Sequence, residues 1–413
     1  MELTLLYLIV AFLVAEYALG RVLEWLNHRQ WAAPVPGEIA DLFNAEERQK
    51  AVAYASHQYY FQLLSSTVSL AITLSFLLNG GFAWADALVR SMTNNETLRG
   101  LLFFGGLMVA SSLLMMPFTI YDTFVIEAKY GFNKTTARVF IADKIKEFLL
   151  GAIIGGLLYA VLAWLYQQFG TSFWWMAWAV AGAFVIGMAA FYTAVLLPIF
   201  NKLTPLEEGP VRQAIEAYAQ KVTFPLQKIL VMDGSTRSSK ANAFFSGLGR
   251  QKSIVLYDTL LTTLSTNEIT AVLAHEVGHY KHRHILQSMV LSLLQLGILF
   301  LLFGWVAAHP ALPHALGAQE PAFYLSLVAF ALLYSPVALL VGVFMNLFSR
   351  KNEYEADAYA RTTYSEEPLI SSLKKLYVNS LGNPNPHPAY VFVHYSHPTL
   401  VQRIRKMRQA AAG

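Results

Sequence analysis

The residues best suited to chemistry lie close together at positions 274–280 of the 413-residue chain. His275 and His279 are four positions apart, and this spacing stacks two imidazoles on one face of a helix. Such a pair can hold one zinc ion, and Glu276 between them can take a proton from water that the metal activates. The plainer interpretation is two surface histidines on a polar helix. The pattern favours metal-assisted hydrolysis.

A helix must carry this pair of histidines. Ser265 and Glu268 have the spacing of a capping box, and residues 269–284 contain no proline. We therefore expect a helix over 269–284.

A third ligand does not follow on the same segment. The metalloprotease pattern that supplies one needs Gly at position 282 and His at position 285. This chain has His282 and Ile285 there. We assign His282 and His284 to the polar, membrane-surface end of the helix.

A carboxylate from a second helix is the remaining source, and residues 352–357 offer three acids. Glu353 and Asp357 are four apart and share a helix face, whereas Glu355 points well round the helix. One acid can bind zinc while the other accepts the second ring N–H of a ligating His. The alternative is an acidic, solvated face.

The composition indicates a membrane protein. Hydrophobic residues make up 55% of the chain, charged residues 14%, and the net charge is +4. No basic-aromatic patch suggests a nucleic-acid partner. Because the chain has no cysteine, it can form neither a disulfide frame nor a thiolate metal site. The first apolar run lacks a cleavage site and is interpreted as a retained span.

Seven apolar runs are long enough to cross a bilayer, near residues 3–20, 61–84, 100–122, 148–168, 173–200, 285–308 and 322–348. We expect the polar segment 21–60 to lie at the membrane surface. The connections 21–60 and 123–147 together contain nine Lys and Arg residues, whereas the connections on the opposite side contain two. The positive-inside rule therefore places the N-terminus outside and the C-terminus inside.

Helix lengths support Glu353 as the third ligand. About thirty residues run from His279 through the sixth apolar run, and about thirty from the start of the seventh run to Glu353. At roughly 1.5 Å per residue, each stretch spans about 45 Å. The chain therefore returns Glu353 to the level of His279.

The segment 201–284 also predicts a helix near 211–222 and β-structure. The expected strands are 228–232 and 253–257, with residues 242–245 and a turn at 247–250 between them. A strand edge beside the metal could hold an extended peptide by main-chain hydrogen bonds. An ordinary hairpin that packs on the helix is the alternative.

Two further residues near the C-terminus could help the reaction. His397 precedes a proline at a loop–helix junction, and Arg403 follows about two turns later. Both could donate hydrogen bonds to the oxyanion formed when water attacks a carbonyl. A structural capping role is the alternative for each.

Seven motifs follow one another along the chain: 130–134, 201–208, 233–239, 242–244, 275–279, 353–357 and 396–398. With them the chain resembles the integral-membrane zinc CAAX prenyl proteases of the a-factor-converting type over nearly its whole length. Two departures, Lys240-Ala241 for His-Ser and Thr399 for a second proline, lie near the expected peptide groove. A cysteine-free, compact chain is typical of a prokaryotic member.

The resemblance implies zinc on His275, His279 and Glu353, with Glu276 as general base. It also implies Asp357 as an acid that orients a ligand, His397 and Arg403 near the transition state, and substrate contacts at Asn242 and Ala243. The implied fold is mainly α, with seven transmembrane helices (1–200 and 285–348) that enclose a chamber. A cytoplasmic, gluzincin-like protease domain with a small β-hairpin or sheet (201–284 and 349–413) caps that chamber.

The expected function is a membrane-embedded zinc endopeptidase acting on peptides or proteins, with or without an attached lipid, in contact with membrane lipids. A bacterial inner membrane is expected, or the endoplasmic reticulum in a eukaryote. One alternative is an HtpX-like quality-control protease, which has fewer spans. Another is a transporter or lipid-binding protein whose zinc site is structural and closed by four protein ligands.

Overall fold

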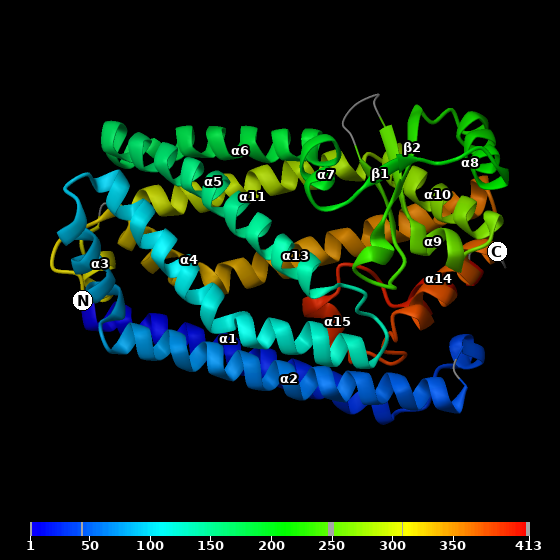
Figure 1. Cartoon of the computed structure of the whole chain (residues 1–413), viewed down its shortest axis with the longest axis horizontal. Helices are drawn as coiled ribbons and strands as arrows, with labels where there is room; N and C mark the ends of the chain where they lie inside the picture. Colours follow the sequence, from blue (N-terminus) through cyan, green and yellow to red (C-terminus); the bar gives the residue numbers. More distant parts are fainter. Residues whose placement is uncertain (1, 43, 247–251, 308, 410–413) are drawn as a thin grey trace.

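Long α-helices dominate the structure, a computed structural model that describes residues 2–42, 44–246, 252–307 and 309–409. The N-terminus and the C-terminus lie at opposite ends of the molecule (Figure 1). The helices are α1 (Glu2–Arg29), α2 (Ala45–Leu78), α3 (Gly81–Met92), α4 (Glu96–Tyr121), α5 (Ala137–Phe169), α6 (Trp174–Phe191), α7 (Leu197–Phe200), α8 (Pro210–Lys221), α9 (Asp258–Thr263), α10 (Thr266–Lys281), α11 (His284–Val306), α12 (Ala311–Ala315), α13 (Phe323–Thr363), α14 (Glu366–Asn379), α15 (Pro388–His394) and α16 (Leu400–Gln409). The strands are β1 (Leu203–Pro205), β2 (Leu226–Met232), β3 (Ala243–Ser246) and β4 (Lys252–Tyr257).

The membrane-spanning part consists of long apolar helices. Within the described residues, six segments are long and apolar enough to cross a membrane: Glu2–Ala32, Ala45–Leu78, Glu96–Glu127, Ala137–Phe200, His284–Val306 and Phe323–Thr363. The protein is therefore a multi-pass membrane protein. The fourth segment contains both α5 and α6, which correspond to two separate apolar runs of the sequence. The expected number of seven spans stays a prediction.

The segment 21–60 is divided among several helices, and its expected position at the membrane surface stays a prediction. Residues 21–29 extend α1, and residues 45–60 form the start of α2. A capping box starts α2 well before its apolar run, because the Asn44 side chain accepts from the Glu47 N–H at 2.8 Å and Glu47 accepts in return at 3.1 Å. Polar residues thus lengthen both helices, two short 3-10 helices (Gln30–Ala32 and Gly37–Leu42) lie between them, and α1 packs against α2 (Figure 1).

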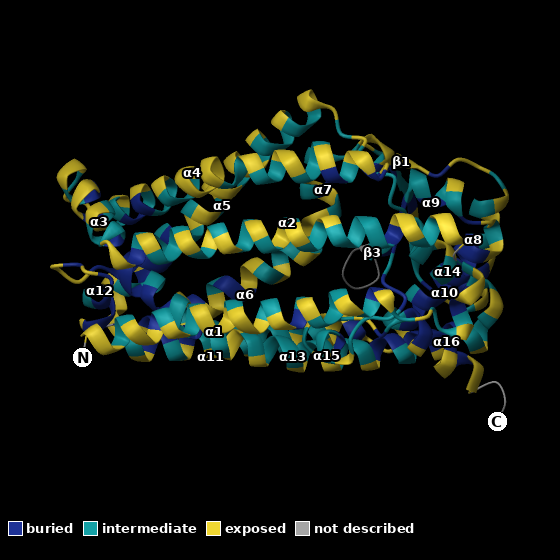
Figure 2. Cartoon of the chain, turned by 90° about the horizontal axis from the view of Figure 1, so that it is seen from below, coloured by how far each residue is buried: buried dark blue, intermediate teal, exposed yellow. Residues whose placement is uncertain are grey.

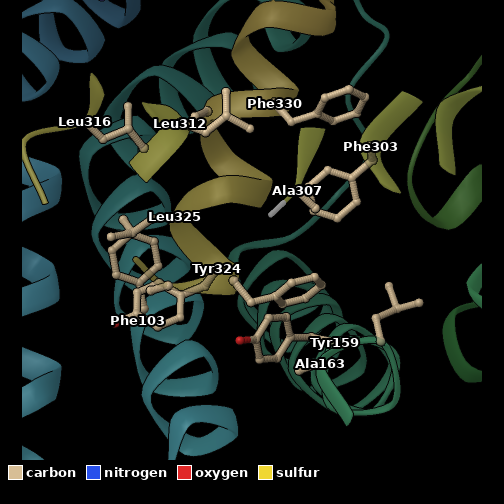
Figure 3. Close-up of a cluster of buried hydrophobic side chains, with 14 of the residues drawn as sticks. Phe103, Tyr159, Ala163, Phe303, Ala307, Leu312, Leu316, Tyr324, Leu325 and Phe330 are labelled. Carbon is tan, nitrogen blue, oxygen red and sulfur yellow. The ribbon is translucent and has the colours of Figure 1, made fainter. Parts of the chain in front are cut away.

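Buried residues gather toward the two ends of the molecule (Figure 2). At the end near the N-terminus, Phe103, Phe303 and Tyr324 are fully buried in a cluster built by α4, α5, α11, α12 and α13 (Figure 3). Gly100 on α4 makes room for this packing, since a Cβ there would lie 1.7 Å from the hydroxyl oxygen of Tyr159. This cluster joins the helices far from the histidine pair.

At the other end, a four-stranded sheet has the order β1-β2-β4-β3. β2 and β4 pair in parallel, and the other two pairs are antiparallel. The expected strands 228–232 and 253–257 are confirmed as β2 and β4, and the expected helix near 211–222 as α8. The predicted turn at 247–250 lies outside the described residues. β3 is an edge strand, and a second hydrophobic cluster packs the sheet on α8, α10, α14 and α16.

The helix that carries the histidine pair begins as expected and ends early. The Ser265 hydroxyl accepts from the Glu268 N–H, and the Glu268 carboxylate accepts from the Ser265 N–H at 2.7 Å, which completes the capping box. The expected end at His284 is wrong. α10 stops at Lys281, Arg283 adopts a left-handed conformation with φ 59°, and α11 begins at His284. The chain therefore turns sharply between α10, which carries the histidine pair, and the apolar helix α11.

Candidate metal centre

The candidate centre forms where α10 packs against the C-terminal part of α13. Nε2 of His275 lies 3.2 Å from Nε2 of His279, so both imidazoles face one point. The Glu353 carboxylate faces the same point, with Oε1 3.2 Å from Nε2 of His279 and Oε2 3.5 Å from Nε2 of His275. The structure thus brings together the three residues that the sequence suggested as ligands.

These three side chains suit a metal ion. Their ligand atoms all lie within 4.8 Å of one another. The Oε2 atom of Glu353 is buried and accepts no hydrogen bond from any described residue. A buried carboxylate oxygen without a hydrogen bond is unfavourable, and a cation at this point would satisfy it. Two imidazole nitrogens and one carboxylate oxygen form a ligand set that leaves a fourth position open.

Asp357 lies directly behind His275. Its Oδ1 is 2.8 Å from Nδ1 of His275, and its side chain is buried. Arg403 on α16 donates two hydrogen bonds to Asp357, from Nε at 2.8 Å and from Nη2 at 2.6 Å. With Nε and Nη2 engaged, its Nη1 lies 3.5 Å from Glu353. This arrangement suits Arg403 for holding Asp357 and Glu353 in place.

Thr399 explains how α16 presents Arg403. Its hydroxyl accepts from the Gln402 N–H at 3.2 Å, and the Gln402 side chain accepts from the Thr399 N–H at 2.9 Å. This reciprocal pair caps the start of α16, about one turn before Arg403. Threonine at this departure from the family pattern therefore has a clear local role.

Glu276 is partly buried and lines a cleft of about 380 Å³ together with His279. Burial raises the pKa of the Glu276 carboxyl, which makes its carboxylate a stronger base. The cleft also contains Phe244 and Phe245 from β3 and Tyr280 from α10. A basic carboxylate therefore lies beside the candidate metal ligand His279, in a groove that is largely apolar.

His397 lies next to the Glu353 carboxylate and is largely exposed. Its Nε2 lies 3.4 Å from Oε1 of Glu353, and 63% of its side chain is exposed. α13 holds the segment before it, because Asn346 donates to the Val393 carbonyl at 2.7 Å and Arg350 donates to the Val391 carbonyl at 3.1 Å. His397 is thus placed at the open face of the centre.

Asn242 and Ala243 lie at the beginning of the edge strand β3, outside the ligand cluster. The Asn242 carbonyl accepts from the Tyr257 N–H at 3.0 Å, which ties the strand to β4. The preceding Lys240 pairs with Glu127 of the membrane bundle at 3.1 Å. The sheet edge that begins at Ala243 therefore runs beside the cleft.

The expected place of His284 at the polar end of the helix is wrong, whereas Glu355 lies outside the ligand cluster as expected. His284 is buried, and its Nδ1 lies 2.9 Å from Nδ1 of His279. Its Nε2 lies 3.0 Å from the carboxylate of Glu355. The turn at Arg283 creates these contacts, and no glycine or proline in 281–285 indicates that turn.

Comparisons with known proteins agree with the fold and indicate a metallopeptidase. Residues 25–202 match the family described as "CAAX prenyl protease N-terminal, five membrane helices", and residues 205–411 match "Peptidase family M48". The chain is 34% identical to the CAAX prenyl protease 1 homolog of Oryza sativa subsp. japonica, with 99% of each chain covered. It is 33% identical to CAAX prenyl protease 1 of Saccharomyces cerevisiae, with 96% of this chain and 94% of that protein covered. The crystal structure of S. mikatae Ste24p matches with a TM-score of 0.91 and 32% identity over 98% of both chains.

A helical membrane fold with these matches defines an integral-membrane metallopeptidase. The chain belongs to the CAAX prenyl protease family of M48 peptidases. The family resemblance, the mainly helical membrane fold with a small sheet, and the enzyme class expected from the sequence are confirmed.

Proposed function

We propose that this protein is a zinc endopeptidase that processes the C-terminal part of CAAX-type peptides and proteins at the membrane. The observation that carries the proposal is the convergence of His275, His279 and Glu353 on one point, where the buried Oε2 of Glu353 accepts no hydrogen bond from a described residue. Zinc is the preferred ion, because two imidazoles and one carboxylate with an open fourth position form a known catalytic zinc set.

Different residues of the protein serve different steps of peptide hydrolysis. Bound zinc would supply a Lewis acid that activates water and polarises the peptide carbonyl. Glu276 takes the proton of the attacking water and then gives it to the leaving amine. His397, at the open face, donates a hydrogen bond to the carbonyl oxygen as negative charge develops on it. Asp357 and Arg403 hold His275 and Glu353 in their orientation.

The substrate would bind along the sheet edge. β3 is an edge strand, and its Phe244 and Phe245 line the cleft that contains Glu276. An extended peptide could pair with the main chain beginning at Asn242 and Ala243, as edge strands allow. The named activity of the matched relatives suggests a substrate that ends in a CAAX sequence, with its prenyl group in contact with the membrane part.

The organisation of the chain fits this reaction. In this proposal, 1–200 and 285–348 form a membrane bundle that encloses a chamber, and 201–284 and 349–413 form the protease domain. The N-terminus lies at the end of the bundle far from the metal centre (Figure 1). Together with the cation distribution, this placement supports an N-terminus outside and a metal centre facing the cytoplasm. A role in membrane-protein quality control would use the same site on a different substrate.

The experiment that tests the proposal measures zinc and cleavage on the same purified sample. The substrates are a farnesylated peptide with a C-terminal Cys-aliphatic-aliphatic-X sequence and its unlipidated counterpart. We expect about one zinc per chain, and cleavage that falls at least about a hundredfold in Glu276→Gln while zinc is retained. Near-normal turnover in Glu276→Gln, or a wild type without zinc, would contradict the mechanism. Equal cleavage of both peptides would contradict selection for a prenyl group.

A further inference from the structure

Each of the two histidines at the metal centre has its Nδ1 atom engaged on the side away from the metal. Nδ1 of His275 contacts Asp357 directly, at 2.8 Å. Nδ1 of His279 contacts another imidazole, that of His284, at 2.9 Å. His284 in turn contacts the Glu355 carboxylate through Nε2 at 3.0 Å. Both ligand histidines therefore connect to a carboxylate, one directly and one through His284.

The direction of the hydrogen bonds from His279 through His284 to Glu355 is fixed if His279 binds a metal. Nε2 of His279 faces Glu353 and His275, so Nε2 is the ligand atom and the proton of the neutral ring lies on Nδ1. Nδ1 of His279 then donates to Nδ1 of His284. The proton of His284 must lie on Nε2, from which it donates to Glu355. Every donor in the series meets an acceptor.

The backbone is shaped to make this contact. His284 is five residues after His279, so an uninterrupted helix would turn it roughly 140° away, at 100° per residue. Arg283 instead takes a left-handed conformation, with φ 59°. A residue other than glycine is uncommon in this conformation, and such positions concentrate at functional sites. The turn buries His284 to 3% exposure, directly beside the metal ligand.

We propose that His284 and Glu355 are positioning residues that orient His279 and retain the zinc ion, as Asp357 does for His275. The inference rests on the zinc site proposed above. Partners of this kind fix the tautomer and ring orientation of a ligating histidine, and their loss costs about ten- to a hundredfold in metal affinity.

A second metal ion is the competing interpretation, because His282, His284 and Glu355 also lie close enough to form a cluster. The hydrogen-bond directions oppose it. A metal on Nε2 of His284 would move the ring proton to Nδ1, where it would meet the Nδ1 proton of His279 head to head at 2.9 Å. The cluster can therefore serve as a second metal site only at the expense of the contact with His279.

The test measures the rate at which a chelator removes zinc from the full-length protein in detergent. We expect release to be about ten- to a hundredfold faster in His284→Ala and in Glu355→Ala than in wild type. Glu355→Gln keeps an acceptor oxygen for His284 and should recover much of the loss. The double variant His284→Ala/Glu355→Ala should release zinc no faster than His284→Ala alone, because both changes break one series of contacts.

Two control variants separate this role from simple packing. His282 stacks on the His284 ring, with centroids 5.4 Å apart, without a hydrogen bond to the series. Lys351 pairs with the other oxygen of Glu355 at 3.6 Å. His282→Ala and Lys351→Met should change the release rate less than about threefold, and zinc-free protein should melt at a similar temperature in all variants.

Unchanged zinc release in His284→Ala, or faster release that follows only from a lower melting temperature of the zinc-free protein, would overturn the inference. A fall from two zinc ions to one in His282→Ala would overturn it in favour of a second metal site. A wild type that binds no zinc would instead contradict the proposed function itself. The failures of the two proposals are thus distinguishable.

Discussion

Gly278 and Ala356 touch where α10 crosses α13. A Cβ atom at position 278 would lie 2.9 Å from the Cα atom and 3.0 Å from the carbonyl oxygen of Ala356. These are backbone atoms, which cannot move aside as a flexible side chain can. Because Gly278 lies between His275 and His279 in sequence, the close approach sets how near these ligands come to Glu353.

Gly278→Ala should therefore weaken the metal centre without removing any ligand. The added methyl group must push the helices apart, and overpacking of this kind typically costs about 1–3 kcal/mol. We expect faster zinc release and lower cleavage. Gly342→Ala on α13 is the matched control, since a Cβ there meets nothing within 4 Å. If Gly278→Ala retains zinc as well as Gly342→Ala does, the close approach does not control the site.

Loss of a zinc ligand should weaken zinc binding more than loss of Asp357, the acid that supports a ligand. Glu353→Ala should abolish stable zinc binding, because it removes one of three ligands. Asp357→Ala should weaken zinc binding about ten- to a hundredfold, because it frees the ring of His275. Glu367→Ala is the control, an acid on α14 whose side chain is 68% exposed. Equal zinc content in the Glu353 and Glu367 variants would place the third ligand elsewhere.

Local periodicity explains why this part of the site could be predicted. The spacing of four residues places His275 and His279 on one face, and the capping residue Ser265 starts their helix where expected. The similar lengths of the last two apolar runs return Glu353 to the histidines, and the structure brings these side chains together. These relationships follow from helix geometry alone, so they can be predicted from residue spacing and helix length in the sequence.

Features that depend on a break in regular structure could not be predicted. Residues 281–285 contain neither glycine nor proline, so nothing local indicates the left-handed turn at Arg283. Without that turn, the sequence places His284 at the polar end of the helix and gives no sign of its contact with Glu355. Likewise, polar residues in 21–60 favoured a separate segment, although the cap at Asn44 starts α2 early and takes residues 45–60 into that helix.

Glu268 predicts a pH dependence of stability. Burial opposes its ionisation, but hydrogen bonds from Lys375, Ser371 and Ser265 outweigh burial and lower the pKa of Glu268 to about 2. A folded-state pKa below the unfolded value of about 4.3 stabilises the protein above pH 4.3, and this stabilisation is lost as the pH falls toward 2. At neutral pH the contribution should be on the order of 2–3 kcal/mol.

Glu268→Gln should therefore lower the melting temperature of the zinc-free protein at pH 7, and the difference from wild type should shrink as the pH approaches 3. Thermal unfolding in detergent, followed by tryptophan fluorescence, measures both. Glu367→Gln, on the neighbouring helix and exposed, should match wild type throughout. A difference that does not change between pH 7 and pH 3 would show that the lost contribution is packing and not charge.

The orientation of the protein in the membrane decides which compartment the substrate must reach, and cysteine labelling can determine it. The chain has no native cysteine, so single cysteines report without background. Ser235, near the protease sheet, and Gln319, between the last two spans, are both exposed, whereas the neighbouring Ala318 is buried. A membrane-impermeant thiol reagent added outside intact cells should label Gln319→Cys and leave Ser235→Cys unlabelled until the cells are opened. The reverse pattern would place the metal centre outside the cytoplasm, and it would leave the zinc chemistry unchanged.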